Sequence, residues 1–150
     1  MCNRSRVQTD GDPFDLKRFV DAQAPVYASV VDELRGGRKR SHWMWFVFPQ
    51  LLGLGSSPMA ARYGITSLHE ARAYLHNELL GPRLRECTQL VNQVQHRSIA
   101  QIFGSPDNLK LRSSMTLFAL AADDNRDFVE LLDKYYRGRH DPLTLAELGG

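Results

Sequence analysis

Apolar residues recur at steps of three and four along most of this chain, and this spacing constrains its fold more than any other feature. Such spacing puts apolar side chains on one face of an α-helix, whereas a half-buried strand needs alternating polarity. Three stretches show the helical spacing most clearly: Leu84, Cys87, Val91 and Val94; Leu111, Met115, Phe118 and Ala122; and Phe128, Leu131, Leu132 and Tyr135. No stretch alternates in polarity, and no repeat of fixed period is visible. The chain is therefore predicted to be all-α.

Proline, glycine and small polar residues mark where these helices begin and end. A proline at the first helical position is expected after Asp12, Ser57, Gly81, Ser105 and Asp141. Ser67 and Glu70 predict a capping box, and Ser98 is expected to cap a short helical turn. The stretch from Trp43 to Phe48 is too short for periodicity to classify, and we interpret it as an irregular helical turn.

These boundaries predict a compact single-domain array of about seven to nine short and medium helices over residues 12–150. Residues 1–11 are polar and lack periodicity, so they are expected to form a disordered N-terminal arm. With 150 residues, of which 43% are hydrophobic, the chain has enough apolar surface for one core.

The location of the protein is predicted from what the sequence lacks. No apolar run approaches the roughly 18 residues of a membrane span, and the first residues are polar and charged rather than those of a secretion signal. Cys2 and Cys87 do not suggest a disulfide framework, since Cys87 falls on an apolar helix face. The sequence therefore predicts a cytoplasmic protein with no membrane partner.

The segment Gly36–Gln50 is the densest unusual feature, because three cations precede two tryptophans and two phenylalanines. Its candidate ligand-binding residues are Arg38, Lys39 and Arg40 for an anion, and Trp43 or Trp45 for a ring. Cationic side chains form charge-assisted hydrogen bonds to phosphate, and an indole offers a flat face for stacking. The segment predicts a site for a small anionic, nucleotide-like ligand. The alternative is that the cations are solvated and the aromatic residues belong to the core.

A second basic group could complete this site. Lys110, Arg112 and Ser113 fall near the start of a predicted helix, where the helix dipole also favours an anion. The alternative is that these polar residues only face water between inward-pointing Leu111 and Met115. The glycine-containing segment from Leu52 to Ser57 lacks a phosphate-loop motif and is interpreted as a turn.

His42 is the candidate catalytic residue, because it lies between the cations and the tryptophans. Nearby cations favour its neutral imidazole, which could act as a base in an N-glycosidase or a phosphoester hydrolase. A structural role at the edge of the core is the alternative for this side chain. No two histidines are four residues apart with a carboxylate, so neither a metal site nor a cofactor is predicted.

Protein and nucleic acid are the two remaining candidate partners. Exposed tryptophan and arginine are enriched at interfaces, which keeps a protein-interaction module as an alternative function. Nucleic acid is the less favoured partner, because the net charge is only +2 and no basic stripe recurs along a helix.

The chain resembles a bacterial family through the segments DPFDLKRFVDAQAPVY (12–27), GRKRSHWMWFVFPQLLGLGSSPMAARYGI (37–65) and DNLKLRSSMTLFALA (107–121). This is the domain of unknown function family 1810, whose members often carry the label calpastatin. The resemblance covers about residues 12–140 and implies an all-α fold without assigning an activity or a catalytic residue. The calpastatin label does not fit, because animal calpastatin is a flexible inhibitor that folds on binding, whereas this sequence predicts a globular core.

Overall fold

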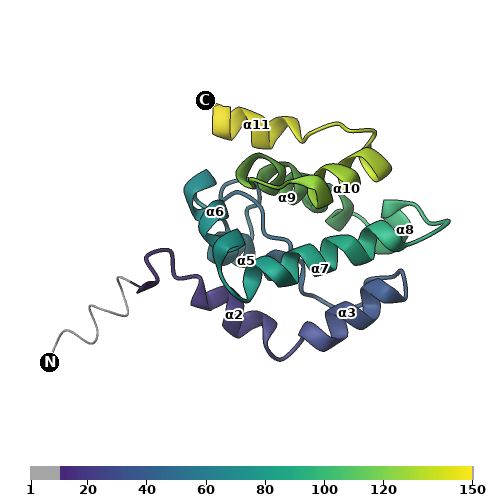
Figure 1. The fold of residues 1–150 in the computed structure, drawn as a ribbon, viewed down its shortest axis with the longest axis horizontal. Helices are drawn as coiled ribbons and strands as arrows, with labels where there is room; N and C mark the ends of the chain where they lie inside the picture. The colour runs from purple at the N-terminus through teal and green to yellow at the C-terminus, as the bar shows by residue number, and fades with distance from the viewer. Residues whose placement is uncertain (1–10, 150) are drawn as a thin grey trace, which may run out of the picture.

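The computed structural model describes residues 11–149, and within them all ten named secondary-structure elements are helices (Figure 1). The all-α prediction is confirmed, although the helices slightly outnumber the expected seven to nine. The stretch from Trp43 to Phe48, predicted to be an irregular helical turn, contains one regular helical turn, α4 (Met44–Val47). The predicted N-terminal arm lies outside the described residues except for Gly11.

The described helices are, in chain order, α2 (Lys17–Gln23), α3 (Tyr27–Arg35), α4 (Met44–Val47), α5 (Pro58–Tyr63), α6 (Leu68–His76), α7 (Leu80–Gln93), α8 (Ile99–Phe103), α9 (Asp107–Ala121), α10 (Arg126–Tyr136) and α11 (Pro142–Gly149). None of them has the length and apolar character that crossing a membrane requires.

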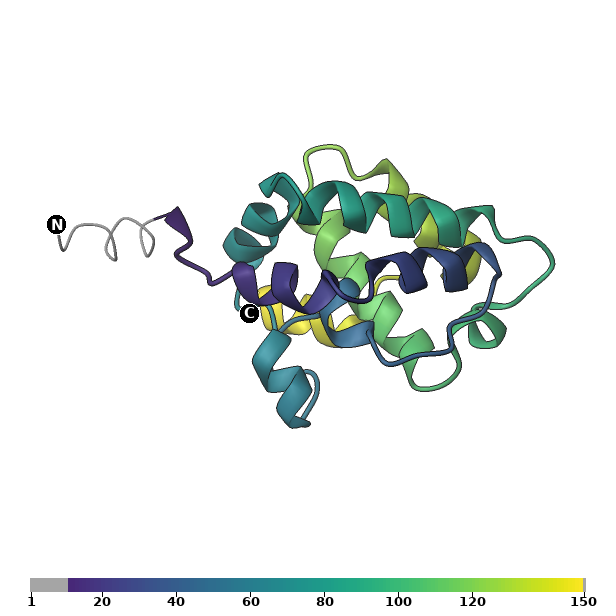
Figure 2. The same cartoon turned by 90° about the horizontal axis from the view of Figure 1, so that it is seen from below.

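Helix α9 lies at the centre of the fold. Its residues from Ser113 to Ala119 are all buried, as expected for a helix that has neighbours on every side. It packs against α6, α8, α10 and α11, while α7 packs against α3, α6 and α10. In Figure 1 α11, the pair α9 and α10, α7 and α3 follow one another from top to bottom. Figure 2 shows α5 projecting from the rest of the helices.

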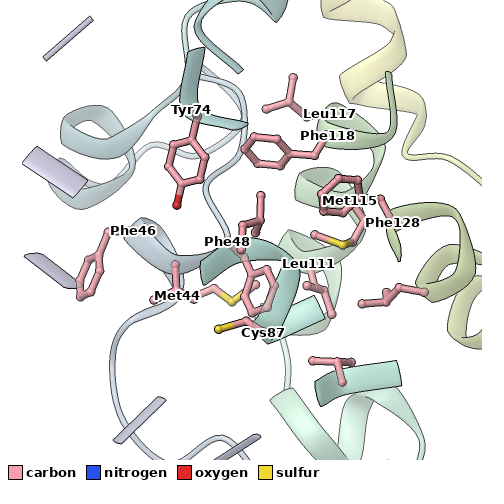
Figure 3. Packing of buried hydrophobic residues seen from close by; sticks show 14 of the residues in the cluster. Met44, Phe46, Phe48, Tyr74, Cys87, Leu111, Met115, Leu117, Phe118 and Phe128 are labelled. Carbon is pink, nitrogen blue, oxygen red and sulfur yellow. The ribbon is translucent and has the colours of Figure 1, made fainter. Parts of the chain in front are cut away.

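Aromatic side chains dominate the core around α9. Phe118 contacts Tyr74 of α6 and Phe128 of α10, with ring centroids 5.3 and 6.0 Å apart (Figure 3). Burying each such side chain contributes about 1.5–3 kcal/mol relative to leaving it in water. Cys87 lies in the same core, where burial raises the pKa of its thiol to about 12. The thiol is therefore protonated at neutral pH and behaves as a small apolar side chain.

The loops on either side of α5 are held together by backbone pairing. Leu51 and Ile65 form an isolated parallel bridge, in which the Ile65 amide donates to Gln50 O and the Leu52 amide donates to Ile65 O, both at 2.9 Å. Gly64 is needed here, because a Cβ at this position would lie 2.7 Å from Leu52. The bridge fixes where α5 sits relative to α4.

Candidate functional site

The carboxylate of Glu33 organises the basic loop between α3 and α4. It accepts hydrogen bonds from the Arg40 amide at 2.7 Å, from the amide and hydroxyl of Ser41, and from the Trp43 indole Nε1 at 2.9 Å. Burial by itself would raise the pKa of Glu33, but the hydrogen bonds from Ser41, Arg40 and Trp43 outweigh it and hold the pKa below its ordinary value. The loop therefore has a defined conformation anchored at the end of α3.

Asp107 brings the two predicted basic segments together. Its carboxylate pairs with Lys39 Nζ at 2.9 Å and lies 3.9 Å from Lys110 Nζ. Lys39 makes two further hydrogen bonds. Its ammonium donates to Ser41 O, and its backbone amide donates to Ile102 O at 2.7 Å. Its side chain is only 8% exposed, whereas that of Lys110 is 30% exposed. Of the two ammonium groups, that of Lys110 is the freer to reach a ligand.

A pocket of about 240 Å³ opens between α4, α5 and the start of α9. We call it the Trp45 pocket, and it is lined by Met44, Trp45, Phe48, Gln50, Gly55, Ser56, Ser57, Ala60, Tyr63, Gly64 and Lys110. The backbone bridge described above frames one wall. Gly55 brings the loop close to α5, because a Cβ there would lie 2.8 Å from the Ala60 side chain.

Trp45 and Lys110, two of the predicted ligand-binding residues, line this pocket together. The Lys110 ammonium lies 5.5 Å from the centre of the Trp45 ring, within the range of a cation–π interaction. The Trp45 Nε1 atom is buried and has no hydrogen-bond partner among the described residues. A flat apolar surface, a cation and polar groups therefore share one concave site, which is the usual composition of a small-molecule pocket.

The other predicted residues of the basic loop lie elsewhere. Trp43 is 1% exposed and packs in the core, with its indole bound to Glu33. Arg38, Arg40 and His42 are exposed and do not line the Trp45 pocket. His42, the candidate catalytic residue, is therefore not part of the Trp45 pocket.

Arg112 and Ser113 hold the chain that leads into α11. The Arg112 guanidinium donates to the carbonyl oxygens of Arg139 at 3.0 Å and His140 at 2.7 Å. The buried Ser113 hydroxyl lies 3.0 Å from Asp141 Oδ2, to which it donates. Both side chains thus point to the α10–α11 connection rather than to the Trp45 pocket.

Sequence reasoning missed Gln50, Ser56 and Tyr63 as pocket residues, and it treated the neighbouring glycine loop as a turn. A usable signal was present, because the small residues Gly55, Ser56 and Ser57 directly precede a short helix. The Leu51–Ile65 bridge, which brings this glycine-containing loop next to α4, could not be predicted from the sequence. Among the described residues no group of three or more His, Cys, Asp or Glu side chains could hold a metal ion.

The fold and the Trp45 pocket define a class of protein: a helical domain with a concave pocket beside its central helix. The chain belongs to the family described as protein of unknown function (DUF1810), whose pattern matches residues 13–148. It is also similar to a solved structure, the conserved hypothetical protein Rv1873 from Mycobacterium tuberculosis, with 73% sequence identity and a TM-score of 0.92. That similarity covers 93% of this chain and 99% of the other. No curated protein matches.

Proposed function

We propose that this protein binds a small anionic ligand with a flat ring, such as a mononucleotide, in the Trp45 pocket. The observation that carries the proposal is that Trp45 and Lys110 line one pocket, although they come from distant parts of the chain. An indole face stacks on any planar ring, and an ammonium group pairs with phosphate or carboxylate.

The local charge favours an anion. Lys39 and Lys110 share the single carboxylate of Asp107, which leaves one positive charge in excess at the start of α9. Because Lys39 holds Asp107 at 2.9 Å and Lys110 stands at 3.9 Å, the Lys110 ammonium is not locked in a hydrogen bond to that carboxylate. It is the group expected to turn toward a ligand's phosphate.

The walls of the pocket fit the rest of such a ligand. Met44, Phe48 and Ala60 supply apolar surface for a ring, while Gln50 and Ser56 supply hydrogen-bonding groups. A volume of about 240 Å³ is slightly below the range of about 300–1,000 Å³ that small-molecule sites usually have. The size favours one ring with one charged group over a dinucleotide.

The hydrolase alternative receives less support from this pocket than binding does. The predicted base, His42, is not among the residues that line it. We therefore propose binding, and the N-glycosidase or phosphoesterase activity stays a prediction to be tested by incubating the same compounds with the protein and analysing the products by mass spectrometry.

Tryptophan fluorescence can test the binding proposal directly, because the chain contains only two tryptophans. In a Trp43→Phe variant the remaining signal comes from Trp45 alone. We expect a saturable change on titration with at least one nucleoside monophosphate, nicotinamide mononucleotide or sugar phosphate. The matching uncharged nucleoside should bind at least about tenfold more weakly, since the charged hydrogen bond is lost.

Two lysine variants make this test specific. Lys110→Gln should weaken binding at least about tenfold. Lys17→Gln is the matched control, because it also removes one positive charge but from a side chain that is 74% exposed on α2. Calorimetry on the unmodified protein should give the same affinity as fluorescence. The proposal fails if no compound saturates the Trp45 signal, or if the two lysine variants bind equally well.

A further inference from the structure

Four arginines gather at the end of the molecule where α3 stops and α8 begins. We call Arg35, Arg38, Arg40 and Arg97 the arginine patch. Figures 1 and 2 both show the end of α3 beside the loop that leads from α7 to α8. Within residues 11–149, no ion pair forms to any of these four guanidinium groups.

The carboxylates near the patch do not neutralise it. Asp32 and Glu33 line the same shallow hollow as Arg35 and Arg40, but Glu33 is occupied by the loop amides, Ser41 and Trp43. The four arginines outnumber these two carboxylates by two. A local excess of positive charge therefore remains at this end of the molecule.

Arg38 and Arg97 line a second hollow, of about 480 Å³, that contains no carboxylate among its lining residues. We call it the Arg97 depression. Lys39 also lines it, but its ammonium is paired with Asp107. The side chain of Arg97 lies against the backbone of Gly37, where a Cβ would come within 3.4 Å of Arg97 Cδ and Nε. The absence of a side chain at Gly37 thus leaves room for Arg97 at the rim of the depression.

Gln101 adds a directed donor to the same depression. Its side-chain oxygen accepts the Ser98 amide at 2.8 Å in the capping box of α8, which assigns the oxygen to the helix and leaves the NH₂ group for another acceptor. Two guanidinium forks and an amide donor are a suitable set for phosphate oxygens, because arginine binds phosphate through paired N–H groups.

We propose that the Arg97 depression is a second anion site, separate from the Trp45 pocket, that binds an oligophosphate, meaning two or more phosphate groups linked in series. One phosphate lies between Arg38 and Arg97, and the next reaches across Arg38 toward Arg40 and Arg35. Arg38 joins the two halves, because it lines both hollows.

The size and composition of the patch favour an oligophosphate over nucleic acid. A protein that makes about 6–10 phosphate contacts along duplex DNA needs more cationic groups than the four arginines of the patch. Single-stranded nucleic acid is usually bound with exposed aromatic rings, whereas the nearby Trp43 and Phe103 are 1% and 6% exposed.

Calorimetric titration with inorganic tripolyphosphate at low ionic strength tests this proposal. We expect saturable binding that weakens at least about tenfold in Arg38→Gln and in Arg97→Gln, because each loses charged hydrogen bonds. Arg72→Gln is the matched control, since Arg72 is exposed on α6, at the opposite end of the view in Figure 1. All three side chains lie at the surface, and circular dichroism should confirm unchanged helix content.

Lys110→Gln separates this proposal from that for the Trp45 pocket, because it should weaken tripolyphosphate binding far less than Arg38→Gln does. Equal weakening by Lys110→Gln and Arg38→Gln would show that tripolyphosphate occupies the Trp45 pocket and would overturn the proposal. So would the absence of binding, or full binding by the Arg38→Gln/Arg97→Gln double variant. Saturable binding of a 20-base-pair DNA duplex or of polyglutamate without binding of tripolyphosphate would assign the patch to a different partner and also overturn it.

Discussion

Four donors from the segment Arg40–Trp43 converge on one side chain, that of Glu33. They are two backbone amides, one hydroxyl and one indole N–H. A carboxylate can accept all of them at once, whereas an amide side chain has only one oxygen to offer. The conformation of the loop that carries Arg38 and Lys39 therefore depends on the charge of Glu33.

The first prediction is that Glu33→Gln lowers the free energy of unfolding at neutral pH by about 1–2 kcal/mol, through weaker or lost hydrogen bonds to a charged acceptor. The folded-state pKa of Glu33 lies below its ordinary value of 4.5. Its contribution is therefore fully present above that ordinary value and is lost as the pH falls through the folded-state pKa. Urea unfolding of both proteins between pH 3 and pH 7 measures this.

The difference in unfolding free energy between the original protein and Glu33→Gln should thus shrink as the medium becomes acidic. Glu130→Gln serves as the control, because Glu130 is exposed on α10. A difference that stays constant across the pH range, or one no larger than that of Glu130→Gln, would contradict the role given to Glu33.

The sequence could not show which of the two tryptophans is buried. The sequence predicted that Trp43 or Trp45 would stack on a ligand, and both belong to one aromatic run. Trp43 is the N-cap of α4 and Trp45 is its second residue. Residues two apart around a helical turn point to roughly opposite sides, so one faces the core when the other faces outward. Trp43 is buried and Trp45 lines the pocket. Periodicity within a single helical turn gives no means of deciding which is which.

At the scale of elements, the start of α11 depends on side chains of α9. Asp141 accepts hydrogen bonds from the Thr144 amide at 3.0 Å and from the hydroxyls of Thr144 and Ser113. Its own amide donates to the Thr116 hydroxyl at 2.8 Å. Asp141 therefore caps α11 and docks it onto α9 at the same time.

The second prediction follows from this double role. Asp141→Ala should lower the free energy of unfolding by about 1–2 kcal/mol, the upper part of the range for a lost N-cap. Asp141→Asn should lower it much less, because asparagine caps a helix almost as well and still accepts the Ser113 hydroxyl. Thermal and urea unfolding compare the two variants, and equal losses would remove the capping role.

Helices α5 and α11 begin at Pro58 and Pro142 as expected, whereas α2 begins at Lys17 rather than at Pro13, and α7 begins at Leu80 rather than at Pro82. The partners of the capping residues could not be predicted from the sequence. Ser67 caps α6 as expected, but Glu70 does not complete the predicted box, since its carboxylate binds Thr66 and Arg18 instead. The complete capping box forms at Ser98 and Gln101. The local sequence predicts the capping residue, but the tertiary fold determines which partner a charged side chain binds.

At the scale of the whole molecule, Arg18 connects α2 to the segment that surrounds α5 and α6. Its guanidinium donates to the carbonyl oxygens of Arg62 at 2.9 Å and Gly64 at 3.1 Å, and it pairs with Glu70 at 3.0 Å. The Glu70 side chain is only 2% exposed. The pair therefore lies in a region where an unpartnered charge is costly.

The third prediction is that Arg18→Ala lowers the free energy of unfolding by about 3–5 kcal/mol, because Glu70 is left buried without a cation. Adding Glu70→Gln to this variant should restore part of the loss, since the unpaired charge is then removed. Arg72→Ala, at an exposed position of α6, should change stability by less than about 0.5 kcal/mol. A similar loss in the two single arginine variants, measured by urea unfolding, would show that the ion pair matters little.

The fold class could be predicted because helical spacing repeats along the chain and needs only local information. The candidate site could be predicted only in part. Lys39 and Lys110 were both singled out, but only the packing of α8 and α9 against the basic loop brings them to Asp107. The same packing separates Arg38 and Arg40 from the Trp45 pocket. The sequence had predicted a single site that contained these two residues and Trp45.

Asp107 stands between the two proposed anion sites. It pairs with Lys39, which lines the Arg97 depression, and lies near Lys110, which lines the Trp45 pocket. A negative charge brought to either lysine would alter how tightly this carboxylate pairs with the other, so the two proposed binding equilibria would be linked. Such linkage is reciprocal: each anion changes the affinity for the other by the same factor. An affinity measured at one site then depends on the occupancy of its neighbour, and the first turn of α9 is where that dependence arises.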